Sequence, residues 1–307
     1  MFKNVGKRFA FIAVLALTLI VAACGGSDGD SESSGDNGDS SGGSNVGDGK
    51  SIELVYVEWD TEVASTHVIG KVLEDLGYDV TLTPLDNAVM WQSVANGESD
   101  AMVAAWLPAT HGDLFEEYKD QVVDLGANFD GAKIGMVVPS YMDIDSIEDL
   151  PEVADELDQT ITGIEPGAGV VKASENSVEE YGLDGWEVQT SSSGAMATAL
   201  GEAIDNEEPI AVTGWSPHWK FAEYDLKYLE DPKEVYGGAE EIKTMARQGL
   251  EEDLPNAYKV LENFSWGEEK FNNVMLEIHN GTDPEEAAAT FVEENQDLVD
   301  EWTADVE

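Results

Sequence analysis

The sequence has little of the chemistry that most enzymes use. Its single cysteine, Cys24, excludes a disulfide within the chain, and only four histidines occur among 307 residues. No Gly-x-Ser-x-Gly elbow, nucleotide-binding loop or His-Glu-x-x-His motif is present. We therefore predict that the protein is not an enzyme and that it carries no metal and no cofactor.

Basic residues are also scarce. Lysine and arginine total 15 against 64 aspartates and glutamates, which gives a formal net charge of −49 at pH 7. Such a chain repels nucleic acid and anionic lipid, so neither is an expected partner. The acidic residues are spread along the whole chain, which we interpret as adaptation to high salt, where self-repulsion is screened. A cation-attracting surface with a role of its own is the alternative.

The N-terminus predicts the cellular address. A basic start, a short apolar stretch and small residues before Cys24 indicate a lipoprotein signal peptide at residues 1–23. The apolar stretch is too short and wrongly flanked for a permanent span. Cys24 would carry lipid and anchor an extracytoplasmic protein to the outer face of the cell membrane, with no other membrane contact. The Gly/Ser/Asp-rich residues 24–50 predict a flexible tether.

From residue 51 the chain alternates between strand-like and helix-like segments, a pattern typical of α/β folds with a mostly parallel sheet. One strand-helix-strand-helix-strand series lies in residues 51–140 and another in residues 141–235. We predict two solute-binding lobes with a ligand cleft between them. The expected strands are 52–59, 79–85, 101–106, 133–138, 160–164, 186–190 and 209–215. The expected helices are 63–76, 88–95, 170–181, one within 146–157 and one opening at Gly194.

The remaining residues, 236–307, show weaker strand signals. We predict helices at 240–250, 256–263, 268–279 and 283–306, the last beginning with an Asp-Pro start signal. These C-terminal helices are expected to pack on the lobes and to carry no chemistry.

Three tryptophans follow strand-like segments: Trp59, Trp106 and Trp215. Two of them lie in matching contexts, residues 104–111 and 212–219, where Trp-x-Pro is followed by a histidine. Open α/β sheets bind ligands at strand ends. A quaternary ammonium has no N–H and is held by aromatic faces, at about 0.5–2 kcal/mol per contact. The pattern therefore predicts an aromatic pocket. Four tryptophans within helix or strand patterns are assigned to packing: Trp91, Trp186, Trp266 and Trp302.

Four segments resemble those of the glycine betaine-binding lipoproteins of osmoprotectant ABC importers: residues 57–66, 105–111, 163–169 and 213–219. The resemblance extends over essentially all of residues 51–305. It implies a two-lobed, periplasmic-binding-protein-like fold of type II.

The resemblance also implies a role for each of six residues. Three indoles would form a cage around the trimethylammonium, and one imidazole and two backbone amides would hold the carboxylate. A glycine-rich turn into a helix N-terminus suits the second task, because it presents free N–H groups and a favourable dipole. In the order just given, these residues are Trp59, Trp106, Trp215, His111, Gly169 and Val170.

The other histidines are assigned no ligand. His218 follows Trp215 much as His111 follows Trp106, but the resemblance favours His111, and we interpret His218 as structural or supporting. His67 and His279 are interpreted as structural or surface residues.

These observations predict the extracytoplasmic substrate-binding protein of an ABC importer. It would bind glycine betaine, and proline betaine too, and deliver it as a monomer to a permease and its ATPase for osmoprotection. A carnitine or choline receptor is the alternative within transport, although choline lacks the carboxylate that His111 and Gly169 would hold. Outside transport, an acidic structural lipoprotein of the cell surface is the alternative.

Overall fold

The computed structural model describes residues 46–304 and 306–307, which belong to one compact unit. The predicted signal peptide, Cys24 and most of the predicted tether lie outside the described residues. Among the described residues, no helix has the length and apolar character to cross a membrane.

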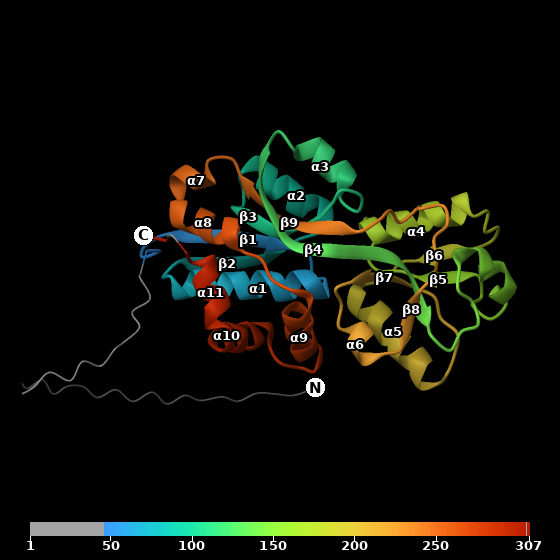
Figure 1. Ribbon diagram of the computed structural model, residues 1–307. Coiled ribbons are helices and arrows are strands. Elements are labelled where there is room, and N and C mark those ends of the chain that lie inside the picture. Colours follow the sequence, from blue (N-terminus) through green and yellow to red (C-terminus); the bar gives the residue numbers. More distant parts are fainter. Residues whose placement is uncertain (1–45, 305) are drawn as a thin grey trace, which may run out of the picture. The chain divides into compact units, whose positions relative to one another are not determined.

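The centre of the fold is a mixed sheet in the order β2-β1-β3-β9-β4-β7-β5-β6, with β8 paired to β4 (Figure 1). Its first half contains three parallel strands followed by the antiparallel β9. We call this half-sheet and its helices the first lobe. Its strands are β1 (Ser51–Tyr56), β2 (Asp79–Pro84), β3 (Ala101–Leu107) and β9 (Glu240–Arg247).

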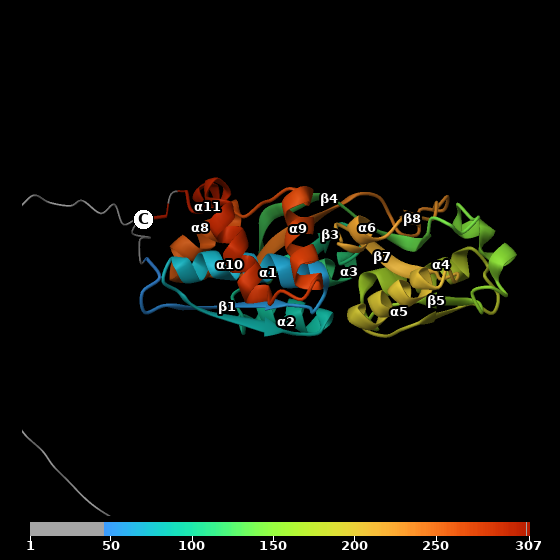
Figure 2. The same cartoon turned by 90° about the horizontal axis from the view of Figure 1, so that it is seen from below.

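The second half-sheet repeats part of this arrangement. Strands β6, β5 and β7 are parallel to one another. We call this half-sheet and its helices the second lobe, and it lies at the right of both views (Figures 1 and 2). Its strands are β5 (Thr160–Thr162), β6 (Glu187–Gln189), β7 (Val212–Ser216) and β8 (Leu226–Tyr228).

Strand β4 (Val122–Pro139) joins the two half-sheets. Its first part pairs antiparallel with β9 as far as Ala132, and its second part pairs with β7 from Lys133 and with β8. A single 18-residue strand therefore runs from one lobe into the other.

Helices cover both faces of the sheet (Figures 1 and 2). In the first lobe α1, whose inward face is almost wholly buried, contacts the C-terminal helices α9 and α10. The helices of the two βα series are α1 (Asp60–Asp75), α2 (Asn87–Asn96), α3 (Gly112–Tyr118), η1 (Ile147–Val153), α4 (Gly169–Glu180), α5 (Ser193–Asp205) and α6 (Lys220–Glu223). The C-terminal helices are α7 (Leu250–Asp253), α8 (Pro255–Asn263), α9 (Glu268–His279), α10 (Pro284–Glu294) and α11 (Gln296–Trp302).

The predicted alternation of strands and helices is confirmed in both lobes. The orders β1-α1-β2-α2-β3 and β5-α4-β6-α5-β7 match, and each series ends in Trp-x-Pro. Leu107–Pro108 and Ser216–Pro217 are both cis peptide bonds. The sheet is mixed because β4 and β9 enter it antiparallel.

The predicted helix at 240–250 is wrong, because residues 240–247 form strand β9. Glu241 and Lys243 favour a helix locally, but Ile242, Thr244 and Ala246 alternate with them and are buried between β3 and β4. Tertiary packing overrides local propensity at this position.

The single helix predicted at 283–306 is two helices, α10 and α11, because Asn295 has non-helical backbone angles. Trp266 and Trp302 pack in an aromatic cluster with Phe291, as their assignment to packing predicts.

Candidate functional site

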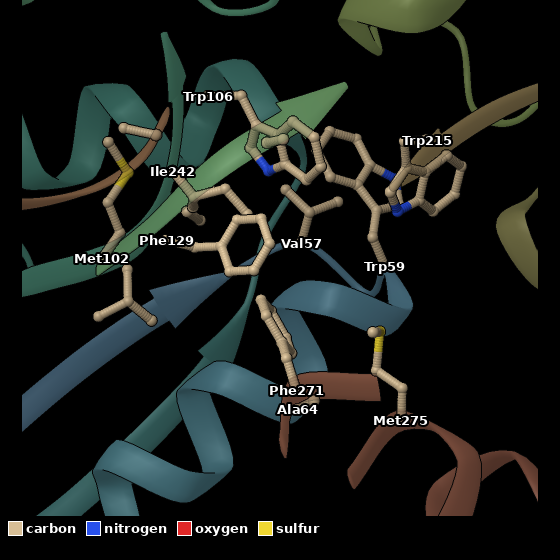
Figure 3. Close-up of a cluster of buried hydrophobic side chains, with 14 of the residues drawn as sticks. Val57, Trp59, Ala64, Met102, Trp106, Phe129, Trp215, Ile242, Phe271 and Met275 are labelled. Carbon is tan, nitrogen blue, oxygen red and sulfur yellow. The ribbon is translucent and has the colours of Figure 1, made fainter. Parts of the chain in front are cut away.

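Three indoles from three different elements surround one cavity. Trp59 precedes α1 and serves as its N-cap residue, Trp106 lies near the end of β3, and Trp215 lies on β7. All three line the same cavity, and Figure 3 shows their rings grouped together. Trp59 and Trp106 lie at the ends of parallel strands of the first half-sheet and Trp215 at the end of β7 in the second, so strand ends of both half-sheets meet at the cavity, as expected for a ligand site.

The cavity encloses about 300 Å³ of empty space, its open mouth included. All six residues that the sequence predicted for the site line it, namely Trp59, Trp106, Trp215, His111, Gly169 and Val170. Five further residues line the cavity that were not predicted as ligand-binding, namely Thr61, Thr110, Ile134, Ile164 and Ala168. Four of them lie within the segments that carry the resemblance, residues 57–66, 105–111 and 163–169, and only Ile134 lies outside those segments.

His111 offers a hydrogen-bond donor to the cavity. Its Nδ1 accepts the backbone N–H of Trp106 at 3.1 Å, and Nε2 is buried without a partner. Burial lowers the pKa of His111 to about 3, and the nearby Ala104 carbonyl opposes this only in part. The imidazole is therefore neutral, and because the Trp106 N–H can only donate, the proton lies on Nε2.

The loop that carries His111 is held by a buried carboxylate from β9. Glu240 accepts the backbone N–H groups of Ala109 and Thr110 at 2.6 and 2.8 Å, and the Thr110 hydroxyl also donates to it. This role of Glu240 could not be predicted from the sequence, because the local pattern favours a helix at residues 240–250. Strand β9, where a helix was predicted, thus supplies the carboxylate that holds the loop of His111.

The N-terminus of α4 forms another wall of the cavity. Gly169 and Val170 are its first two residues, and N–H groups at this position have no acceptor within the helix. A Cβ on Gly169 would lie 2.4 Å from the carbonyl oxygen of Thr110. Glycine is therefore required for this close approach between a second-lobe helix and a first-lobe loop.

Two of the three indoles donate to carboxylates. Trp59 Nε1 donates to Glu165 Oε2 at 3.0 Å, and Trp106 Nε1 donates to Glu62 Oε1 at 2.7 Å. Glu62 is 1% exposed, and its burial raises its pKa to about 7, although the bonds from Thr61 and Trp106 oppose the shift. A carboxylate near an indole makes its surroundings more favourable for a cation.

The third indole has different neighbours. Trp215 Nε1 is buried without a hydrogen-bond partner among the described residues. The ammonium nitrogen of Lys220 lies 4.0 Å from the centroid of its ring, and the imidazole of His218 packs against it edge-on at 4.7 Å. A cationic side chain therefore accompanies Trp215 where carboxylates accompany Trp59 and Trp106.

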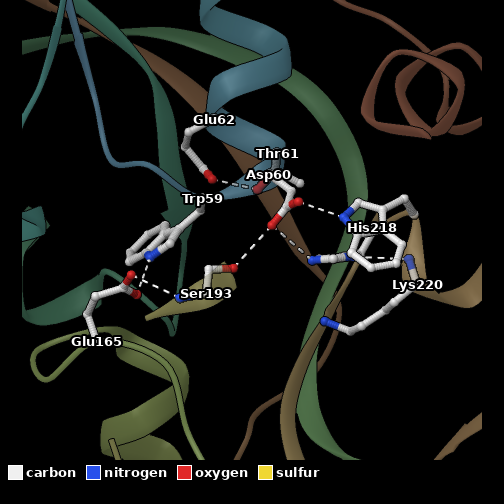
Figure 4. Close-up of polar contacts among 9 residues, drawn as sticks. Trp59, Asp60, Thr61, Glu62, Glu165, Ser193, His218 and Lys220 are labelled. Atoms are coloured by element: carbon white, nitrogen blue, oxygen red, sulfur yellow. Dashed lines mark hydrogen bonds and ion pairs between the residues drawn. The ribbon is translucent and has the colours of Figure 1, made fainter. Parts of the chain in front are cut away.

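Asp60 connects the two lobes behind this cavity (Figure 4). Its carboxylate accepts Trp219 Nε1 at 2.6 Å and the Ser193 hydroxyl at 3.1 Å, and His218 Nε2 lies 3.3 Å away. Burial would raise the pKa of Asp60, but the contacts with His218, Trp219 and Lys220 outweigh it and hold that pKa below its usual range. Glu165 forms a parallel connection, since it accepts the Ser193 backbone N–H as well as the Trp59 indole.

The remaining singled-out residues lie outside the cavity lining. His218 supports Trp215 from behind, and burial lowers its pKa to about 4. The His279 ring stacks on that of Trp219 with 3.4 Å between the ring centroids. The His67 imidazole forms a hydrogen bond with the carbonyl of Val63 in its own helix. Trp91, which the sequence assigned to packing, is fully buried and contacts the His111 ring edge-on at 6.0 Å.

Within residues 46–304 and 306–307, no group of three or more histidine, aspartate or glutamate side chains is arranged to hold a metal ion. The cavity instead combines aromatic faces with uncharged N–H donors. Two α/β lobes around such a cavity define a solute-binding protein.

The chain belongs to the family described as the substrate binding domain of ABC-type glycine betaine transport systems, whose model matches residues 50–294. This confirms the resemblance found in the sequence. The family is one of transport substrate-binding proteins, whose place is outside the cytoplasm.

Solved structures agree with this membership. Lactococcal OpuAC, in its closed-liganded conformation with glycine betaine, is 52% identical, covers 83% of this chain and 99% of its own, and has a TM-score of 0.80. The glycine betaine/L-proline-binding protein ProX of Borrelia burgdorferi is 36% identical, covers 83% and 97% of the two chains, and also has a TM-score of 0.80. The predicted periplasmic-binding-protein-like α/β fold is therefore confirmed.

Among curated proteins, the glycine betaine/carnitine transport binding protein GbuC of Listeria monocytogenes is 49% identical over 158 residues. The match covers 51% of this chain and 53% of GbuC, so the chain spans about half the length of this relative. A choline-binding protein of an ABC transporter, solved with choline, is 30% identical, covers 83% and 92% of the two chains, and has a TM-score of 0.78.

Proposed function

We propose that this protein captures glycine betaine in the cavity between its lobes and delivers it to an ABC importer. The observation that carries the proposal is the convergence of three indoles and an unpartnered imidazole N–H on one cavity. Such a cavity has one end suited to a quaternary ammonium and another suited to a carboxylate.

The cationic end of the ligand would lie among Trp59, Trp106 and Trp215. A trimethylammonium has no hydrogen to donate, so its binding depends on ring faces and on burial of its methyl groups. Three contacts of about 0.5–2 kcal/mol each, with apolar burial added, suffice for micromolar affinity. Glu62 and Glu165 accept hydrogen bonds from the indole N–H groups of Trp106 and Trp59, and their negative charge near these rings further favours a cation.

The carboxylate would accept hydrogen bonds from His111 Nε2 and from the first amides of α4, at Gly169 and Val170. Helix N-termini favour anions through their free N–H groups and dipole. The histidine acts as a neutral donor, because its pKa lies near 3. Binding of the carboxylate would therefore not depend on histidine protonation near neutral pH.

The contacts between lobes suggest how capture works. Trp59 donates a hydrogen bond to Glu165, the Ser193 hydroxyl donates one to Asp60, and Gly169 lies close to Thr110. Each of these contacts joins the two lobes, so the cage and the carboxylate site are complete only when the lobes meet. Ligand binding and lobe closure would therefore be coupled. No catalytic step is required of the protein.

The rest of the predicted biology belongs to the same proposal. Delivery would involve a permease and its ATPase, with the protein acting as a monomer anchored through a lipidated Cys24. Proline betaine fits the same two-ended chemistry. The acidic surface, with a formal net charge of −49, would suit it to concentrated salt.

Calorimetric titration of the purified protein in high salt tests the proposal. Saturable binding of glycine betaine, with no binding of glycine, is the expected result, because glycine lacks the methyl groups that the cage holds. Preference for choline or carnitine over glycine betaine would instead assign the protein to one of the alternative receptors. Absence of saturable binding of any quaternary ammonium would overturn the proposal.

A further inference from the structure

Lys220 is an unusual side chain for the protein interior. It is 0% exposed, and its ammonium nitrogen has no hydrogen-bond partner among the described residues. A buried lysine without a partner is costly, and natural proteins seldom retain one without a role. The Asp60 carboxylate attracts this ammonium but does not accept a hydrogen bond from it.

The position of Lys220 relates it to the cage. Its ammonium lies 4.0 Å from the Trp215 ring centroid. Trp215 lines the cavity and Lys220 does not, so the ammonium meets the indole from outside the cavity. A ligand cation held by Trp215 would therefore share that ring with a second cation.

Two cations near one ring repel each other. The net charge of the ligand decides how much this repulsion weakens the binding of that ligand. With contacts of 4.0 Å on the lysine side and a similar distance on the ligand side, the charges would be separated by roughly 8 Å. At an effective dielectric constant of about 20, this weakens binding of a net cation to the protein with charged Lys220 by about thirtyfold. In a zwitterion, attraction of Lys220 to the carboxylate cancels most of the repulsion and leaves a factor of about two.

We propose that Lys220 is a selectivity residue that disfavours net-cationic quaternary ammonium ligands, such as choline, relative to zwitterions such as glycine betaine. The inference rests on the proposed function, since it concerns the ligand of the same cavity. Lys220 acts on the ligand through Trp215 and does not contact it.

The charged and titratable groups around Lys220 come from several elements. Asp60 of α1 attracts its ammonium, His218 precedes it in the same loop, and exposed His279 of α9 stacks on the adjacent Trp219. Burial lowers the pKa of Lys220 to about 7, with the Asp60 charge opposing. Since His218 is neutral and Asp60 charged above pH 5, Lys220 itself gains charge as pH falls from 8.5 to 6.

Glu62 changes charge in the same pH range, because its pKa is also about 7. Low pH would therefore weaken cation binding through both residues. A neutral substitution at Lys220 at fixed pH separates the two effects, so the decisive comparison is between variants.

The test measures dissociation constants of choline and glycine betaine by calorimetry at pH 6 for the wild type, Lys220→Met and Lys220→Gln. Because Lys220 has a pKa of about 7, it can lose its proton at pH 6 when a cation binds, and this limits the apparent effect. We therefore expect both variants to bind choline about tenfold more tightly than the wild type and glycine betaine no more than about threefold more tightly. Lys133→Met is the matched control, because Lys133 lies 4.0 Å over the Tyr228 ring, which does not line the cavity. It should leave both constants unchanged.

An unchanged ratio of the two constants in both Lys220 variants would overturn the inference, provided that thermal melting shows them folded. A decrease of both affinities together would assign Lys220 to packing of Trp215 only. If the wild type binds no quaternary ammonium at all, the proposed function fails and the Lys220 inference with it. Betaine binding with an unchanged ratio removes only the inference.

Discussion

The two Trp-x-Pro loops carry the same sequence signature but create different electrostatic surroundings. In the first lobe, Trp106 donates to the buried carboxylate of Glu62, and the loop beyond it is held by Glu240. In the second lobe, Trp215 has no acceptor for its N–H and lies under the ammonium of Lys220. One copy is built around anions and the other around a cation.

The histidines of the two loops differ in the same way. His111 presents a free N–H to the cavity, whereas His218 faces Asp60 at 3.3 Å behind Trp215. A repeated motif therefore fixes where an indole is placed, but residues outside the motif decide what that indole can bind. Substitutions in either loop test this contrast.

The largest effect is expected from the indoles themselves. Trp106→Ala should weaken glycine betaine binding by about 3 kcal/mol and Trp215→Ala by about 2 kcal/mol, because both lose apolar burial and a ring face but only the Trp106 indole donates to a carboxylate. Calorimetry of both variants measures the difference. Equal losses would remove the electrostatic contrast, and Trp186→Ala, outside the cavity, is the control for general destabilisation.

The approach of the lobes should be nearly as sensitive. Gly169→Ala places a Cβ 2.4 Å from the Thr110 carbonyl oxygen, so the lobes cannot close fully and affinity should fall by about 2 kcal/mol. The matched control is Gly194→Ala, near the start of α5, where an added Cβ meets nothing within 4 Å. Wild-type affinity in Gly169→Ala would show that this close contact is not needed.

The two histidines should differ in what they hold. His111→Ala removes the N–H donor and should cost about 2 kcal/mol for glycine betaine but little for choline, which has no carboxylate. His218→Ala should affect both ligands equally and more weakly. Because the His111 pKa is about 3, no histidine step is expected in glycine betaine affinity between pH 5 and 8. A larger loss in His218→Ala would reverse the assignment.

Glu62 should make a smaller contribution to the anionic side. Glu62→Gln keeps an acceptor for the Trp106 indole but removes the charge, so we expect affinity for glycine betaine to fall by about 1 kcal/mol at pH 8. Since the pKa of Glu62 is about 7, the wild type should lose this contribution as pH falls through 7. The variant should lack that part of the pH dependence, and an unchanged pH profile would contradict the role.

The smallest effect is expected in stability. The folded pKa of Lys220, about 7, lies below its ordinary value of 10.5, so the unfolded chain binds more protons between these pH values and the cost of burial is complete below pH 7. Lys220→Met should therefore raise the free energy of unfolding at both pH 8 and pH 6, by about 1 kcal/mol more at pH 6 than at pH 8. Denaturant unfolding at both pH values measures this, and destabilisation at pH 6 would contradict it.

Much of the fold followed from the sequence because hydrophobic periodicity and turn signals act locally. The two βα series and most of the helices could be predicted in this way. Strand β9 could not, since Glu241 and Lys243 resemble helix formers and only the packing of Ile242 between β3 and β4 decides the outcome. The passage of β4 from one half-sheet to the other likewise depends on long-range pairing.

The site shows the same division. Trp59, Trp106 and Trp215 could be placed together because strand ends and a repeated motif mark them. Glu240 and Lys220 could not be assigned, because one was hidden in a mispredicted element and the other looked like an ordinary surface lysine. Their roles arise from contacts between residues far apart in sequence or from burial that no pattern records.

Calorimetric titration of the wild type and Trp106→Ala with glycine betaine in high salt determines whether the tryptophan cavity binds a zwitterionic quaternary ammonium. We expect saturable binding by the wild type and a loss of about 3 kcal/mol in the variant if the ligand is held in this cavity. Binding of equal strength in the two proteins, or none in the wild type, would contradict it.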